Sequence, residues 1–382
     1  MRLQVEALRT LFGVRVLFKI PWVRVLRIVC LVAWGAVAID MLALRADLQN
    51  PTAIGTDTSN YYAAGQRLNA GHDLYALTIG DRQVGNGLAP NPWSYPLLSP
   101  PPIAVVWRAL ALLPGDSSMY LWWLAGAASM IGLIFWLILR CRPAALPVLV
   151  VLLPFAGIEA WSGNANAFLI PILAAVWLLA QRGHSATAGS LMGVSLALKL
   201  MPGILIWWFL LKRDWRALRA CGVAVAAAAG ITLLGAGLSS ATRYLEVARE
   251  ANSVGLYWLS PVSIAMQLGL GMLSPLVPYA LAGGAAAFAW RWRRRPGLCY
   301  AACIVGLVLG TPDLRPETLS WLALVVVPWA SESMPSLIRR FKRSGENTPR
   351  SEPASPVVGS YPAAPGVSRS APRWTAQRGF RT

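Results

Sequence analysis

A single carboxylate in a long polar stretch is the first candidate for chemistry. Asp57 follows an apolar segment in the N-terminal part of the chain, and Tyr61 and Tyr62 come shortly after it. Tyr95, directly before a proline, adds a further phenol to the same stretch. A carboxylate held beside a membrane can take a proton from a reacting hydroxyl group, as a general base does. The alternative is a solvated loop aspartate, which is the simpler interpretation of the other acids in this stretch.

A lysine inside an apolar run is the second candidate. Lys199 lies between Leu198 and Leu200, and Pro202 follows closely. Charged groups within membrane segments are costly and by default mark paths for ions or substrates. A cation here can bind a phosphate or another part of a substrate. The alternative is a lysine whose ammonium group extends to the membrane surface.

A carboxylate and two amides at the junction of two apolar runs form the third candidate. Glu159, Asn164 and Asn166 lie close together there, and such groups can line a cleft that binds a sugar. Asn164 can instead cap the helix that follows. Arg243, in a later polar segment, can contact a lipid phosphate, or it can be an ordinary solvated charge.

The composition indicates a membrane protein. The 382 residues are 56% hydrophobic and only 13% charged, whereas a soluble domain has about 25% charged residues. The net charge of +18 comes from basic residues at the ends of apolar runs, which sets membrane orientation and gives no reason to expect a nucleic-acid partner. The five cysteines lie in or beside apolar runs. Neither they nor His72 and His184 form a disulfide framework or a metal-binding pattern.

The candidate residues must be positioned by membrane helices. The apolar runs predict an all-α chain with about nine to eleven spans. The predicted spans are Val25–Leu44, Met119–Leu139, Leu146–Trp161, Phe168–Ala180, Ala220–Leu238, Leu273–Trp290, Gly297–Gly310 and Leu319–Trp329. We interpret Ile103–Leu113 as an interfacial or re-entrant helix, with a transmembrane helix as the alternative, and Ala186–Leu211 as a hairpin of two short helices. With these assignments the basic ends of the spans lie on one side of the membrane.

This topology divides the chain into three parts. Residues 1–24 are a basic, amphipathic cytoplasmic start, and residues 25–335 are the transmembrane catalytic domain. Two exterior loops belong to that domain, 45–117 with Asp57 and 239–272. Residues 336–382, rich in Pro, Ser, Arg and Gly, are predicted to be a disordered basic cytoplasmic tail. The chain is thus expected to cross the cell membrane many times, with both termini in the cytoplasm and the reactive carboxylate outside.

Several short motifs follow one another in a defined order. They are Asp57 with Tyr61-Tyr62-Ala63-Ala64-Gly65, Ala70-Gly71-His72-Asp73-Leu74-Tyr75, Tyr95-Pro96, Gly163-Asn164-Ala165-Asn166, and Lys199-Leu200-Met201-Pro202 before Lys212-Arg213-Asp214-Trp215-Arg216. In this order, over roughly residues 25–335, the chain resembles glycosyltransferase family 87, the polyprenyl-phosphate-mannose-dependent mannosyltransferases of the GT-C class. It differs in having Asn164 where the family often has glutamine and Arg315 where the family often has tryptophan, so the acceptor stays open.

The resemblance implies a GT-C fold with exterior interfacial helices and a specific reaction. A hexose, mannose in the family, would pass from a polyprenyl phosphate to an exterior glycolipid or glycan of the cell envelope, with inversion at the anomeric carbon. Asp57 would be the general base, and no metal or cofactor is implied. The remaining candidates would bind substrate: Tyr61, Tyr62, Tyr95, Glu159, Asn164, Asn166, Lys199 and Arg243.

A transporter or flippase of lipid-linked sugars is the alternative from another functional class. It also needs a polar cleft within the spans, and it predicts repeats with broken helices in both halves of the chain. Only Ala186–Leu211 is visibly broken in the sequence. The sequence does not indicate an oligomeric state.

Overall fold

The computed structural model describes residues 22–46, 56–75, 97, 99–141, 145–251, 260–312 and 314–332. All of these fall in one compact unit, Met1–Leu337. The predictions for most of the basic start, for the tail 336–382 and for Tyr95 concern residues outside the described ones.

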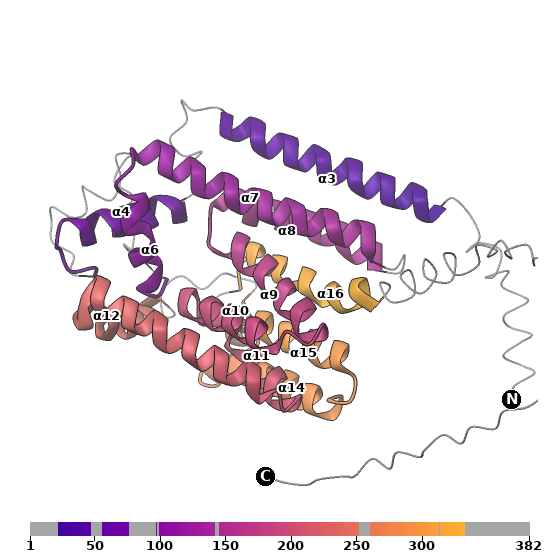
Figure 1. Cartoon of the computed structure of the whole chain (residues 1–382). Helices are drawn as coiled ribbons and strands as arrows, with labels where there is room; N and C mark the ends of the chain where they lie inside the picture. The colour runs from indigo at the N-terminus through magenta and orange to yellow at the C-terminus, as the bar shows by residue number, and fades with distance from the viewer. Residues whose placement is uncertain are drawn as a thin grey trace, which may run out of the picture. The chain divides into compact units, whose positions relative to one another are not determined.

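Helices are the only regular elements in the described part of the chain (Figure 1), as the sequence predicts. The α-helices are α3 (Trp22–Ala46), α4 (Thr56–Asn69), α6 (Pro102–Leu110), α7 (Gly115–Arg140), α8 (Leu146–Ser162), α9 (Asn166–Gln181), α10 (Ser185–Leu198), α11 (Leu205–Leu211), α12 (Trp215–Ala251), α13 (Pro261–Gln267), α14 (Val277–Arg291), α15 (Pro296–Leu309) and α16 (Ala323–Glu332). Short 3-10 helices are η3 (Met201–Ile204), η4 (Ser274–Leu276) and η5 (Pro316–Leu322).

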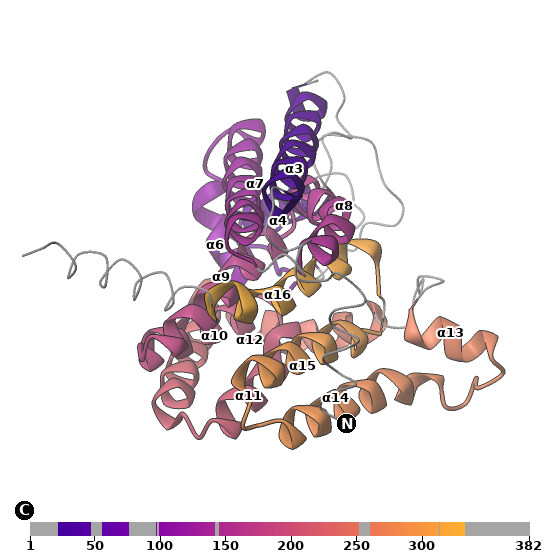
Figure 2. The same ribbon diagram turned by 90° about the vertical axis from the view of Figure 1, so that its right-hand side faces the viewer.

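The helices form two groups with a pair between them. Helices α3, α7 and α8 lie together on one side, and α10, α11, α12, α14 and α15 lie on the other, with α9 and α16 in between (Figure 1 and Figure 2). Helices α4 and α6 lie near one end of α7 (Figure 1). A second apolar cluster, separate from the main core, joins α4, α6 and the start of α7 around the buried Trp107.

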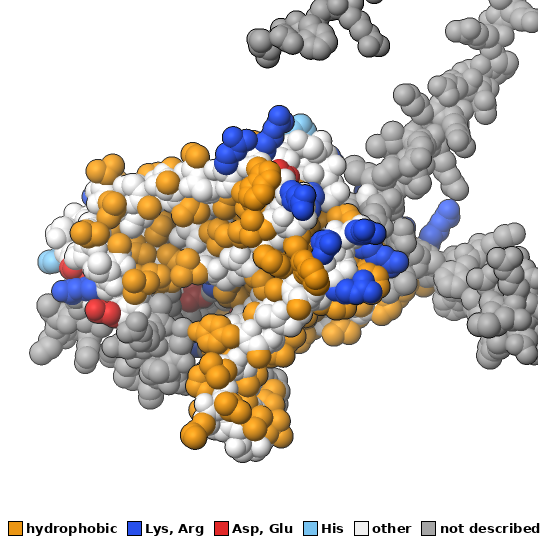
Figure 3. Space-filling model, turned by 90° about the horizontal axis from the view of Figure 1, so that it is seen from below, with side chains coloured by type: hydrophobic (Ala, Val, Ile, Leu, Met, Phe, Trp, Pro, Cys, Tyr) orange, Lys and Arg blue, Asp and Glu red, His pale blue; other side chains and the backbone are white. Residues whose placement is uncertain are grey.

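The surface of the bundle is apolar, which indicates that lipid covers it. Helix α7 and residues Trp215–Val247 of α12 are each long and apolar enough to cross a membrane. Leu234 is 91% exposed and Met272 is 93% exposed, although such side chains avoid water in soluble proteins. Apolar side chains spread over the face shown in Figure 3.

The segment after α9 is broken, as its sequence predicts. Helix α10 ends at Leu198, and Lys199 has extended backbone angles (φ −158°, ψ 132°). Pro202 explains the break, because it lacks an N–H group and disfavours helical conformation just before it. The hydroxyl of Ser185 donates to Asp214 Oδ2 at 2.7 Å. Because the two ends of the segment meet there, it leaves and returns at the same end of the bundle, as a hairpin does.

The two segments predicted as exterior loops contain helices. The stretch 45–117 holds α4, which the sequence did not predict, and α6, which coincides with the predicted interfacial helix Ile103–Leu113. The segment 239–272 holds the end of α12 and α13. Helix α12 is kinked at Gly237 (φ 79°), near the predicted end of the span, and then continues to Ala251. Helix α4, the part of α12 after Gly237 and α13 lack the long apolar run by which a span is recognised.

Helix α6 has the length of an interfacial helix. Its nine residues extend about 14 Å, about half the hydrocarbon thickness of a bilayer. Arg108 anchors it: Nε donates to Asn69 Oδ1 at 3.1 Å, and an Nη1 hydrogen goes to the carbonyl of Gly235 at 3.0 Å. The arginine that interrupts the apolar run therefore joins α6 to α4 and α12.

Candidate functional site

Asp57 lies in the first turn of α4, where the helix dipole favours a negative charge. The residue is half-buried. Its Oδ2 accepts a hydrogen bond from Nδ2 of Asn164 at 2.6 Å. Two of the candidates found in the sequence, 107 positions apart, are therefore in direct contact.

The turn between α8 and α9 is fixed against the helix that carries Asp57. Gly163 ends α8 in the left-handed region (φ 68°), where only glycine is readily accommodated. Its carbonyl accepts from the hydroxyl of Thr58 at 3.1 Å and from Nε1 of Trp122 at 3.0 Å. A Cβ atom at Gly163 would overlap the Thr58 hydroxyl. The close approach of these two segments thus depends on a glycine at this position.

Asn164 has two roles that the sequence presented as alternatives. Its Oδ1 accepts the backbone N–H of Asn166 at 2.9 Å, which caps the start of α9. Its Nδ2 then points to Asp57. Because the hydrogen bond from Asn166 uses Oδ1 of Asn164, the amide N–H group is the end of the side chain that faces Asp57.

Lys199 extends this chain of contacts from the break after α10. Its ammonium group donates to Oδ1 of Asn166 at 2.8 Å. The charges of Glu159, Asp57 and Glu317 all act on it. Asp57, Asn164, Asn166 and Lys199 therefore form one connected polar group between α4, the α8–α9 turn and the broken segment.

Glu159 lies behind this group rather than on an open surface. Its side chain is fully buried on α8, and Oε2 accepts from the hydroxyl of Ser320 at 3.4 Å. Glu159 also lies close enough to Lys199 for the two side chains to influence each other electrostatically.

Glu317 and Arg315 were not among the site residues expected from sequence. Both act electrostatically on Lys199 from the segment that follows α15. The signal for them was a pair of opposite charges on either side of Pro316, in a short polar segment between two apolar runs.

The model for glycosyltransferase family 87 matches residues 98–312, more than half of the chain. This chain belongs to glycosyltransferase family 87. It is therefore an all-α membrane glycosyltransferase. No curated protein and no solved structure matches the chain. The matched region contains the α8–α9 turn and Lys199, whereas Asp57 precedes it, so the contact between Asn164 and Asp57 connects the matched region to α4.

The two tyrosines of this glycosyltransferase near Asp57 differ in exposure. Tyr61 is buried, its hydroxyl accepts the N–H of Ala165 at 3.4 Å, and its ring packs against Trp107 and Trp122. Burial, with a smaller contribution from the charge of Asp57, raises the pKa of Tyr61, so the phenol stays protonated. Tyr62 is half-buried and accepts from Nε2 of Gln66 at 2.8 Å.

Arg243 contacts a different part of the enzyme. Its guanidinium lies 3.8 Å from Oδ1 of Asp73, which also accepts the N–H of Tyr75 at 3.0 Å. The ring of Tyr75 packs near that of Tyr244. This ion pair connects the segment that follows α4 to α12, so Asp73 has a structural role and is not the solvated acid that the sequence predicts.

The described residues contain no group of three or more His, Cys, Asp or Glu side chains that could hold a metal ion. The five cysteines are all buried and unpaired, as expected for packing residues.

Proposed function

We propose that this enzyme transfers mannose from a polyprenyl-phosphate sugar to a hydroxyl group of an exterior glycolipid or glycan, with Asp57 as the general base. The contact between Asn164 and Asp57 is the observation that carries the proposal. It links a carboxylate suited to proton transfer with the part of the chain that matches the family.

In the proposed reaction Asn164 binds Oδ2 of Asp57, and Oδ1 takes the proton of the acceptor hydroxyl. The acceptor oxygen attacks the anomeric carbon while the bond from that carbon to the phosphate oxygen breaks. The bonding electrons leave with the polyprenyl phosphate. A single displacement of this kind inverts the configuration at the anomeric carbon.

Lys199 would stabilise the departing phosphate. Its positive charge is held by Asn166 and acted on by Glu159, so it needs little rearrangement during the reaction. Fixed charges of this kind are among the largest contributions to catalysis. We propose that the reaction uses this cation and no metal ion.

An exterior position for the site is proposed from the connectivity of α7, α8 and α9. Arg140, at the end of α7, and Arg182, just after α9, belong to one end of these helices, and the α8–α9 turn with Asn164 belongs to the other. Basic residues favour the cytoplasmic side. The enzyme would then cross the cell membrane many times, with the donor supplied as a lipid from the outer leaflet and both termini inside.

The test is transfer by membranes that contain the enzyme, supplied with radiolabelled polyprenyl-phosphate-mannose. We expect labelled glycolipid or glycan that is absent from membranes without the enzyme, and equal yield after addition of EDTA. Labelled product formed from a nucleotide sugar in membranes free of polyprenyl phosphate would contradict the proposal. Movement of the labelled lipid between leaflets without glycosyl transfer would instead support the transporter alternative.

A further inference from the structure

A dense basic and aromatic cluster occupies the turn between α14 and α15. Residues 290–295 read Trp-Arg-Trp-Arg-Arg-Arg. The turn joins two apolar helices, and arginine with tryptophan at such a position is typical of the boundary between bilayer and water. It belongs to elements other than those that carry Asp57, Asn164 and Lys199.

Three of the four arginines in this turn have their guanidinium groups over tryptophan rings. Arg295 lies 5.0 Å from the ring centre of Trp292, and Arg291 lies 5.7 Å from the same ring. Arg293 lies 5.0 Å from the ring centre of Trp290. Within the described residues no ion pair joins these arginines to a carboxylate. The cluster therefore presents ordered positive charge that no described acid neutralises.

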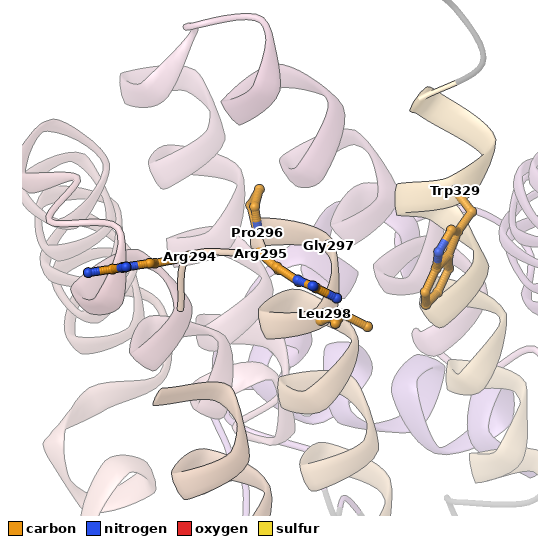
Figure 4. A pocket seen from close by; sticks show the side chains of 6 residues that line it. All are labelled: Arg294, Arg295, Pro296, Gly297, Leu298 and Trp329. Atoms are coloured by element: carbon orange, nitrogen blue, oxygen red, sulfur yellow. The ribbon is translucent and has the colours of Figure 1, made fainter. Parts of the chain in front are cut away.

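Two adjoining cavities open beside these arginines. One, of about 410 Å³, is lined by Arg294, Arg295, residues 296–298 and Trp329 of α16 (Figure 4). The other, of about 430 Å³, is lined by residues 290–295. In Figure 4 Arg295 extends along the first turn of α15 beside Leu298, with the ring of Trp329 facing them. Cavities of this size can hold a phosphate with its glycerol or sugar substituent.

The surface next to the cavities suits hydrocarbon. Phe288 is 49% exposed and Trp290 is 53% exposed, both near the end of α14. A molecule with a phosphate among the arginines would therefore have apolar side chains beside it, toward the membrane. Positive charge next to exposed apolar side chains fits a lipid better than free phosphate, because free phosphate would contact only the arginines.

We propose that the arginine–tryptophan cluster, residues 290–295, together with Trp329, binds the phosphate headgroup of an anionic membrane phospholipid. The guanidinium group of Arg295 contacts the phosphate beside Trp329, the other arginines add positive charge around it, and the acyl chains lie along α14. This inference does not depend on the reaction proposed for Asp57.

The experiment measures lipid binding to the full chain, delipidated in a neutral detergent. Short-chain phosphatidylglycerol is titrated in, with phosphatidylcholine of the same chain length as the neutral lipid, and bound lipid is counted by native mass spectrometry. The test variant is Arg294→Gln/Arg295→Gln. Each arginine near a lipid phosphate contributes about a fivefold factor in affinity, so we expect about 30-fold weaker binding of phosphatidylglycerol. Phosphatidylcholine binding should not change.

The control variant Arg213→Gln/Arg216→Gln removes the same charge from two exposed arginines near the start of α12. It should bind phosphatidylglycerol as the parent does. An equal loss in both variants would overturn the proposal in favour of a general effect of net charge. Unchanged affinity in the test variant would overturn it directly. Displacement of the lipid by millimolar inorganic phosphate would assign the site to free phosphate.

The pair Arg294→Lys/Arg295→Lys keeps the charge but not the planar guanidinium groups. It should lose about threefold to tenfold in affinity, because lysine stacks poorly on tryptophan and binds phosphate through a single point charge. Parent affinity in this variant would show that charge alone acts, without the geometry proposed.

Discussion

The amide of Asn164 donates to the carboxylate of Asp57 at 2.6 Å, across 107 positions of sequence. The same amide caps α9 through the N–H of Asn166. A hydrogen bond that also anchors a helix start is held in one geometry, which is what a general base requires.

Asp57→Asn should lower glycosyl transfer by about 10²- to 10⁴-fold, the usual contribution of a general base. The substituted amide can still bond to Asn164, so the fold and donor binding should remain. Initial rates with labelled donor provide the measurement. The control is Asp116→Asn, an exposed acid in the first turn of α7, which should keep the parent rate. Near-normal turnover in Asp57→Asn would remove Asp57 from the mechanism.

Asn164→Leu should lower kcat/KM by about 10- to 100-fold, because a hydrogen bond to a charged group contributes about 1.5–3 kcal/mol. Asn164→Gln keeps the amide group and should retain most of the activity. The two variants are compared by their kcat and KM for donor. If Asn164→Gln lowers kcat/KM as much as Asn164→Leu does, the hydrogen bond to Asp57 does not account for the loss. The contact of Asn164 with the start of α9 would then be the better explanation.

Lys199→Met should raise the KM for the polyprenyl-phosphate donor and lower kcat/KM by about 10²-fold, the effect expected on loss of one preorganised group that stabilises developing charge. Methionine keeps the length of the apolar stem, so packing changes little. Lys212→Met is the control, since Lys212 lies beyond the other end of the broken segment, over the ring of Trp208. Donor kinetics equal to those of the parent would return Lys199 to a structural role.

Gly163→Ala should destabilise the enzyme more than Gly183→Ala does. Both glycines have positive φ (68° and 84°), so both alanines cost about 1–2 kcal/mol in backbone strain. A Cβ at Gly163 also overlaps the Thr58 hydroxyl, whereas one at Gly183 meets open space. The overlap should add about 1–3 kcal/mol, measured as a lower thermal midpoint in detergent.

Glycosyl transfer should also fall more in Gly163→Ala than in Gly183→Ala. Gly163→Ala displaces α4 from the α8–α9 turn and with it the Asp57 carboxylate, so transfer should fall even at temperatures where the protein stays folded. Equal stability and activity of the two alanine variants would show that the Thr58 contact with this turn has no consequence.

The sequence predicted the helices best where they are apolar. The run Met119–Leu139 became α7, and the break between Leu198 and Pro202 is visible because a charge and a proline interrupt an apolar run. It missed α4, because a polar stretch with a glycine and several small residues has no apolar run to recognise. A weaker signal was present: Tyr61, Ala64 and Leu68 recur at helical spacing, and all three are buried.

The residues of the site also divide into those that the sequence identifies and those that it does not. The sequence identifies four site residues one at a time, because charged and amide side chains are rare beside apolar runs. These residues are Asp57, Asn164, Asn166 and Lys199. Glu317 and Arg315 were missed, and Arg243 pairs with Asp73 instead. Which polar groups meet depends on the packing of α4 against the α8–α9 turn, and no local pattern encodes that.

The sequence by itself determined that this protein is an α-helical membrane chain related to glycosyltransferases, because hydropathy, basic ends and short motifs are local properties. Only the tertiary structure decided that Asp57 meets Asn164 and that Lys199 reaches the same group. The physical reason is steric: the missing side chain at Gly163 lets Thr58 reach the carbonyl of the turn. That one close approach fixes where the carboxylate lies.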